Sequence, residues 1–125
     1  MSTIKVDTIK NTSNVEVFTA KAWVNFDGTQ AAASMIRASG NVSSIVDNGT
    51  GDYTVNFATA MSDADYAINV SGGTGATVGA GTEFTIAAAP KRGYAPSTNS
   101  VRVGFVNNGN SAAYDFAYIS VAIFR

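Results

Sequence analysis

Apolar and polar residues alternate with a period of two along most of this chain. The alternation runs through residues 53–57, 66–70, 84–88 and 101–105, where every second side chain is apolar. A period of two is typical of β-strands that bury one face, because successive side chains point to opposite sides of a sheet. The only helix-like window covers residues 31–38, which is short and is soon followed by Gly40. The pattern therefore predicts a series of short strands.

Turn-forming residues separate these strands. Asn48-Gly49 lies between residues 42–46 and 53–57 and is a strong signal for a tight hairpin. Further turn signals occur at residues 27–28, 71–73 and 107–110. Many short strands without intervening helices predict an all-β fold, an antiparallel β-sandwich of jelly-roll-like type. We expect residues 1–20 to form an N-terminal arm or attachment strand and residues 21–125 to form the sandwich.

The C-terminal segment, residues 115–125, is unusual because both of its faces are apolar. One face carries Phe116, Tyr118, Ala122 and Phe124, and the other carries Ile119, Val121 and Ile123. Burying the last three side chains is worth about 5–8 kcal/mol, which is comparable with the net stability of a domain. Two interpretations remain open: a central strand inside its own domain, or a strand packed between protomers. For the second, we expect an oligomer interface that contains Trp23, Ile119, Val121 and Ile123.

The small number of charged residues bears on how much of the protein surface is exposed to water. Charged residues make up only 14 % of the sequence, and small soluble domains normally cover more of their surface with charge. We therefore expect part of the surface to be buried against partner chains. The net charge of −1 offers no basic excess for phosphates, so nucleic acid is not an expected partner. The sequence has neither a signal-peptide pattern nor a long apolar run, which predicts synthesis in a cytoplasm and no membrane insertion.

The inventory of reactive side chains argues against catalysis. The chain has no histidine and no cysteine, so it lacks the commonest general base and the thiolate nucleophile. A glycosidase-like carboxylate pair would have to come from Asp63, Asp65, Glu83 and Asp115, and no motif brings two of them together. We therefore expect no enzyme activity, no catalytic residue, no cofactor and no metal site.

Two glycine-containing loops resemble ligand-binding motifs but are better explained as turns. Residues 71–81 are rich in glycine, yet the following residues 82–86 predict a strand, whereas a phosphate loop needs a helix. Residues 47–52 space oxygen ligands like a calcium loop, but no glutamate stands where a bidentate ligand is required. We interpret the second loop as the hairpin turn.

The segment 90–96 is the best candidate for a ligand-binding loop. It places Lys91, Arg92 and Tyr94 between the only two prolines of the chain. A stiff loop loses less entropy on binding, and tyrosine and arginine offer an apolar plate and a planar set of donors. These groups suit a sugar or an anionic surface polymer. The alternative is an ordinary solvated loop whose tyrosine packs against the domain.

A set of segments extends nearly from one end of the chain to the other: residues 21–28 (KAWVNFDG), 36–39, 41–45 and 47–57 (DNGTGDYTVNF), together with the beginning at 2–9 and the end at 119–125. These segments resemble a module at the distal ends of tail-fibre-like proteins of tailed phages, especially phages of marine bacteria and cyanobacteria. The resemblance implies a homotrimer on the virion whose module faces the host. It also implies a variable region at residues 71–100, and it implies no particular binding residue. Typical fibres carry a long stalk before this module, so a fibre, a short spike and a capsid-bound protein all remain open.

Two main functional hypotheses follow, and a weaker third one stands beside them. The first is a tail-fibre or receptor-binding protein of the virion that attaches to a host cell-surface glycan. The second is a structural virion protein of the head, baseplate or tail that binds no cell-surface ligand. In both, we expect residues 1–20 to bind other virion proteins. A depolymerase that cleaves a surface carbohydrate is a third and weaker hypothesis.

Overall fold

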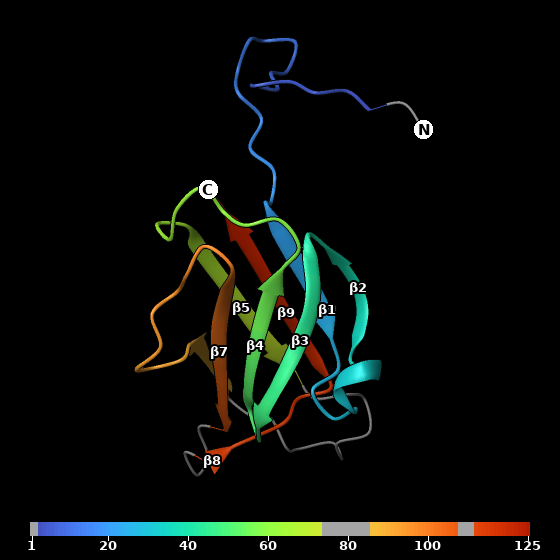
Figure 1. Ribbon diagram of the computed structural model, residues 1–125, viewed down its shortest axis with the longest axis vertical. Coiled ribbons are helices and arrows are strands. Elements are labelled where there is room, and N and C mark those ends of the chain that lie inside the picture. Colours follow the sequence, from blue (N-terminus) through green and yellow to red (C-terminus); the bar gives the residue numbers. More distant parts are fainter. Residues whose placement is uncertain (1–2, 74–85, 108–111) are drawn as a thin grey trace.

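The computed structural model describes residues 3–73, 86–107 and 112–125 and shows two antiparallel β-sheets packed face to face (Figure 1). One sheet has the strand order β2-β1-β9-β5, and the other has the order β3-β4-β7-β6 with β8 added beside β7. The strands are β1 (Ala22–Phe26), β2 (Ile36–Gly40), β3 (Val42–Gly49), β4 (Asp52–Phe57), β5 (Ala67–Gly73), β6 (Ile86–Pro90), β7 (Ser100–Asn107), β8 (Ala112–Ala113) and β9 (Tyr118–Phe124). The predicted all-β sandwich is confirmed.

The predicted hairpin is formed by β3 and β4. Ile45 pairs with Val55, and the turn closes at Gly49 and Gly51, whose φ angles are 135° and 63°. Both angles lie in the left-handed region, where a side chain is strained and glycine is not. The Gly51 amide donates a 2.7 Å hydrogen bond to Asp115 Oδ1, which fixes the turn to the segment that leads into β9.

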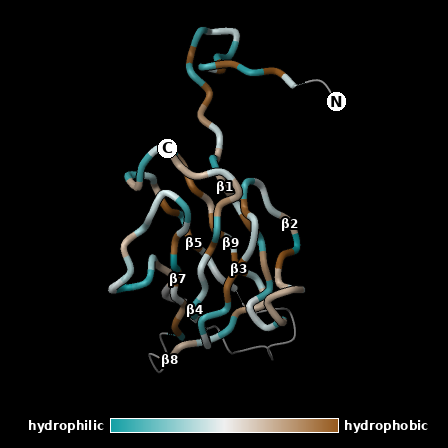
Figure 2. The backbone as a smooth tube through the Cα atoms, in the orientation of Figure 1, coloured by the Kyte–Doolittle hydropathy of each residue, from teal (hydrophilic) through white to brown (hydrophobic). Residues whose placement is uncertain are grey.

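The core lies between the two sheets and is rich in aromatic residues. Tyr53 is fully buried and packs edge-on against Phe26 and Phe105, at centroid distances of 5.2 and 6.0 Å. Its hydroxyl lies 3.0 Å from the Gly28 carbonyl oxygen and 2.5 Å from Asp115 Oδ1. Figure 2 shows the alternation of hydrophobic and hydrophilic positions along the strands that produces this arrangement. One tyrosine thereby links a loop, a strand of each sheet and the segment before β9.

The C-terminal strand is a central strand of its own domain. It lies between β1 and β5, and Ile119, Val121 and Ile123 are 0 %, 2 % and 1 % exposed in the single chain. The prediction that these three side chains form an oligomer interface is therefore wrong, because the opposite sheet already covers them. Trp23, the fourth predicted interface residue, points out of the sandwich and remains 43 % exposed.

The helix-like window at residues 31–38 divides into two elements. A single 3-10 turn, η1 (Ala32–Ser34), is followed directly by strand β2. An isolated helix of one or two turns has little stability of its own, and here Ile36 pairs with Phe26 of β1 instead. Within the described residues, no helix has the length and hydropathy needed to cross a bilayer.

The N-terminal residues 3–20 lie outside both sheets and extend away from the end of the sandwich where β1 begins (Figure 1). Their backbone makes one isolated bridge, between Lys10 and Glu16. Of the glycine-rich segment 71–81, only residues 71–73 are described, and they belong to β5. The predicted strand residue Phe84 and the carboxylate of Glu83 lie outside the described residues.

Candidate ligand-binding surface

The loop after β6 begins with a tight turn that presents the predicted ligand-binding residues. The Tyr94 amide donates a 3.2 Å hydrogen bond to the Lys91 carbonyl oxygen, and Gly93 between them has a φ of 84°. This geometry is that of a type II turn, which requires a positive φ at its third residue. The Lys91 amide donates to the carbonyl oxygen of Arg102 at 2.7 Å, so the turn is attached to strand β7.

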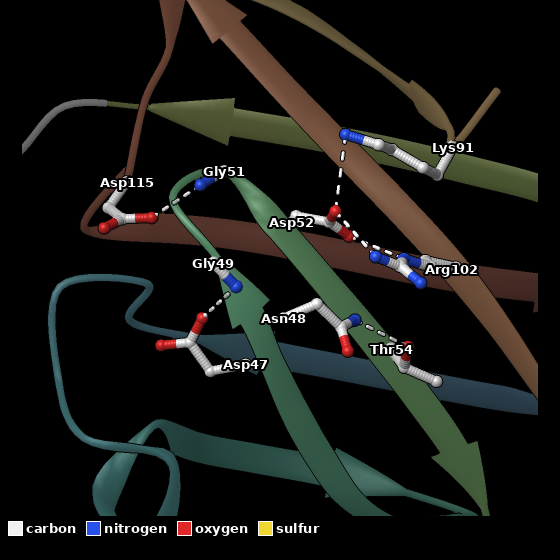
Figure 3. A network of polar contacts seen from close by, with 9 residues as sticks. All are labelled: Asp47, Asn48, Gly49, Gly51, Asp52, Thr54, Lys91, Arg102 and Asp115. Atoms are coloured by element: carbon white, nitrogen blue, oxygen red, sulfur yellow. Dashed lines mark hydrogen bonds and ion pairs between the residues drawn. The ribbon is translucent and has the colours of Figure 1, made fainter.

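Beside this turn, two basic side chains converge on one carboxylate (Figure 3). Arg102 Nε and Nη2 donate to Asp52 Oδ1 and Oδ2 at 2.8 and 2.9 Å, and Lys91 Nζ lies 3.4 Å from Asp52 Oδ2. The hydrogen bonds from Arg102, with the charge of Lys91, lower the pKa of Asp52. The Asp52 side chain is therefore ionised and held in one orientation near neutral pH.

The same arginine supports the tyrosine of the turn. The Arg102 guanidinium carbon lies 3.8 Å from the centre of the Tyr94 ring, which is cation–π geometry. Tyr94 nevertheless remains 49 % exposed. The ring is thus fixed by an arginine that is itself fixed by Asp52, and part of it stays open to solvent.

The surface around this cluster is polar because the strands bury their apolar face. On β4, Asp52, Thr54 and Asn56 alternate with the buried residues of the core. Asn48 Nδ2 donates to Thr54 Oγ1 at 2.8 Å, and Asn56 Nδ2 donates to Ser44 Oγ at 3.1 Å. We call Asp52, Lys91, Tyr94 and Arg102 the Tyr94 cluster. The outer face of the sheet β3-β4-β7-β6 therefore presents amides and hydroxyls next to this cluster.

Two of the three predicted ligand-binding residues meet at one place in the structure. They gather around Asp52 and Arg102, which the sequence alone did not identify as part of a site. Lys91 and Tyr94 both contact the Asp52–Arg102 pair. Arg92 lies in the same turn, is exposed, and makes no ion pair within the described residues. Asp52 and Arg102 carry a signal in the alternation, since each is the charged residue on the solvent side of a strand whose other face is apolar.

A hollow of about 520 Å³ lies elsewhere, near the base of the N-terminal arm. Its lining includes Lys21, Asn41, Met61 and Arg125. Arg125 donates to both oxygens of Asp63, at 2.9 and 2.7 Å, and holds the pKa of that carboxyl at about 2. Asn41 uses its amide on backbone groups of the neighbouring segments. Among the described residues, the lining of this hollow contains no aromatic side chain, whereas the Tyr94 ring is exposed beside Asp52, Lys91 and Arg102, so we assign the candidate surface to that cluster.

Two of the four carboxylates considered for catalysis serve separate structural contacts. Asp63 binds Arg125, while Asp115 accepts hydrogen bonds from Tyr53 and the Gly51 amide. Within the described residues, no group of three or more acidic side chains is placed to hold a metal ion.

Comparisons with known proteins yield a structural match and no sequence match. No protein-family model matches the chain, and no curated protein matches it. The chain is similar to part of a solved phage tailspike, that of phiAB6, whose structure was determined in complex with three-repeated oligosaccharides of Acinetobacter baumannii surface polysaccharide. The TM-score is 0.53 and the sequence identity 16 %, over 98 % of this chain and 29 % of the tailspike chain. At this identity the likeness shows a shared fold, and this chain spans less than a third of the tailspike.

Proposed function

We propose that this protein is a homotrimeric tail component of a bacteriophage and that it attaches to a polysaccharide on the host cell surface. The observation that carries the proposal is the cluster on the outer face of the sheet β3-β4-β7-β6. There, an exposed Tyr94 ring lies against Arg102, beside Lys91 and Asp52. The structural likeness to a tailspike supports the proposal through the fold.

The chemistry of the cluster fits a sugar chain. A pyranose ring has an apolar face that stacks on an aromatic side chain, and its hydroxyls need both donors and acceptors. Tyr94 supplies the aromatic plate, Lys91 and Arg92 supply donors, and Asp52 and the amides of β3 and β4 supply acceptors. The stiff turn and the Arg102 support reduce the entropy lost when the ligand binds.

The test is binding of the purified full chain to an array of bacterial capsular and O-chain polysaccharides. We expect the wild-type protein to bind at least one of them. Tyr94→Ala should weaken that binding about 5–10-fold, the worth of one aromatic contact, and Arg92→Ala should also weaken it. Lys5→Ala, which removes an exposed charge from the arm, is the matched control and should bind like wild type. Equal binding by Tyr94→Ala and Arg92→Ala would refute the assignment of this surface.

We further propose that binding takes place without cleavage of the polysaccharide. The proposal rests on the lack of histidine and cysteine in the sequence and on the structural engagement of Asp63 and Asp115. The bound polysaccharide should keep its chain length after prolonged incubation, as measured by size-exclusion chromatography. A progressive shortening would contradict a purely binding role.

A structural role in the virion is the second candidate, and the N-terminal arm favours it. Residues 3–20 extend from the sandwich with apolar side chains exposed, which suits docking on another virion protein. Immunogold labelling of virions distinguishes the candidates. Labelling at the end of the tail supports host attachment, whereas labelling over the head would make the structural role the first choice.

A further inference from the structure

The outer face of the sheet β2-β1-β9-β5 carries three large aromatic side chains. Trp23 on β1 is 43 % exposed, and Tyr118 and Phe124 on β9 are 53 % and 39 % exposed. They point outward because the residues that alternate with them, including Val121, point into the core. This is the side of β9 opposite to the one for which the sequence analysis predicted an interface.

The strand register places these aromatics among small residues. Trp23 stands opposite Ala122, so that Phe124 is its diagonal neighbour on β9. On the other side, Trp23 pairs with Gly40 of β2, and a side chain at Gly40 would collide with the indole. The indole therefore lies over the glycine, and Trp23 and Phe124 make this end of the face apolar.

At the other end of the face, the charge of Arg37 is already compensated. Its guanidinium lies 4.4 Å from the centre of the Tyr118 ring and donates to Asp27 Oδ2 and Asn25 Oδ1, each at 3.2 Å. The remaining outward residues of β5 and β9 are small or uncharged; they are Ala67, Asn69, Ser71, Ser120 and Ala122. The face thus presents no uncompensated charge that would oppose its burial.

The N-terminal arm is a second apolar surface without a partner in the single chain. Its exposed apolar side chains are Ile4, Val6, Ile9, Val15, Val17 and Phe18, and their exposed fractions range from 42 % to 87 %. The arm spans residues 3–20 and turns back on itself, since the Val17 amide donates to the Ile9 carbonyl oxygen and Lys10 bridges Glu16. It projects from the end of the sandwich where β1 begins, so its apolar side chains are open to a neighbouring molecule (Figure 1).

The area of this sheet face shows whether the face alone can form a stable protein–protein interface. Four strands spaced about 4.8 Å apart and about 20 Å long present roughly 400 Å². A stable interface buries about 800 Å² on each partner. The face supplies about half of that area, so a stable contact needs a further apolar surface, and the arm is one.

We propose that a second copy of this chain covers the outer face of the sheet β2-β1-β9-β5, with the arm of one copy lying along its neighbour. The inference rests on the proposed oligomer and names its contact surface, and it is independent of the polysaccharide ligand. The low charge of the chain, 14 %, agrees with a surface that is buried in the assembly.

The test is the mass of the full chain in solution by light scattering coupled to size exclusion, combined with tryptophan fluorescence. Trp23 is the only tryptophan, so its emission reports directly on this face. Wild type should have a mass of about three times the chain mass of 12.9 kDa, as the proposed homotrimer requires. Phe124→Asp and Ser120→Arg should both have the single-chain mass, with Trp23 emission shifted to longer wavelength. Ser120 is an exposed residue, so Ser120→Arg decides the outcome if Phe124→Asp fails to fold.

The matched control is Val46→Asp, which places the same charge at an exposed apolar position of the other sheet. This variant should keep the wild-type mass. Phe18→Asp in the arm should dissociate at a concentration about 10-fold or more above that of wild type, the effect of one buried apolar side chain.

Three results would overturn the inference. A wild-type mass of 12.9 kDa would reject both the proposed oligomer and this contact surface. A wild-type oligomer that Ser120→Arg leaves intact would reject the surface alone. A monomer that loses polysaccharide binding on Phe124→Asp would assign the face to the ligand instead.

Discussion

Removal of the Tyr53 hydroxyl should destabilise the protein without changing its packing. This hydroxyl lies 2.5 Å from Asp115 Oδ1 and 3.0 Å from the Gly28 carbonyl oxygen in a fully buried site. A hydrogen bond to a charged group contributes about 1.5–3 kcal/mol. For a chain of this length, 1 kcal/mol corresponds to about 4 °C. Tyr53→Phe should therefore lower Tm by about 6–12 °C at pH 7.

The same substitution has a distinct pH signature. Burial, together with the hydrogen bond to Asp115, raises the pKa of Tyr53 above its ordinary value of 10. Above pH 10 the unfolded chain loses this proton and the folded chain keeps it, so wild-type stability falls by about 1.4 kcal/mol per pH unit through Tyr53 alone. Phenylalanine carries no such proton. The difference between wild type and Tyr53→Phe should therefore close between about pH 11 and pH 12.

The assay is urea unfolding of both proteins at pH 7 and at steps above pH 10. Tyr118→Phe is the matched control, because the Tyr118 side chain is 53 % exposed and loss of its hydroxyl should change the free energy of unfolding by less than about 0.5 kcal/mol. A loss below 0.5 kcal/mol in Tyr53→Phe at pH 7, or a difference from wild type that stays constant to pH 12, would refute the reasoning.

Two further predictions concern stability. Asp52→Asn should cost about 1 kcal/mol at pH 7, and the cost should vanish in acid. The hydrogen bonds from Arg102 lower the pKa of Asp52, so their contribution is present above the ordinary value of 3.8 and is lost as pH falls through the lowered one; chemical unfolding from pH 7 to pH 2 measures this, and a constant difference would contradict it. Asn41→Ala should be destabilised by about 2–4 kcal/mol, because Asn41 has a φ of 53° and its amide binds Lys21 and Thr59. Asn41→Gly relieves the backbone strain alone and should recover only part of that loss in the same measurement, whereas full recovery would mean that the amide contacts contribute nothing.

The strands could be predicted because their signal is local. Residues 53–57 and 101–105 alternate strictly, and both become strands with one face in the core. Asn48-Gly49 identified the hairpin because a tight turn needs residues that tolerate positive φ, and Gly49 adopts 135°. Each of these features depends only on neighbours in the sequence.

Which face of the C-terminal strand meets the core could not be predicted, because both of its faces are apolar. Alternation says which residues share a face, but it does not say which face meets the core when neither is polar. The pairing of β9 with β1 and β5 decides it, and places Val121 inside and Phe124 outside. That pairing joins segments that are far apart in the sequence.

The candidate site could be predicted only in part, because strand pairing brings some of its residues together from distant parts of the sequence. Lys91 and Tyr94 were identified because a short loop concentrates them between two prolines. Asp52 and Arg102 are 50 residues apart in the sequence, and only the register of β4 against β7 brings them together. A charged residue on the outer face of an alternating strand is a weak signal until its cross-strand neighbours are known.

The most direct test of the central claim is binding of wild type and Tyr94→Ala to the array of bacterial surface polysaccharides. The account predicts that wild type binds at least one polysaccharide and that Tyr94→Ala binds the same one about 5–10-fold more weakly. Absence of binding to every polysaccharide on the array, or unchanged binding by Tyr94→Ala, would contradict it.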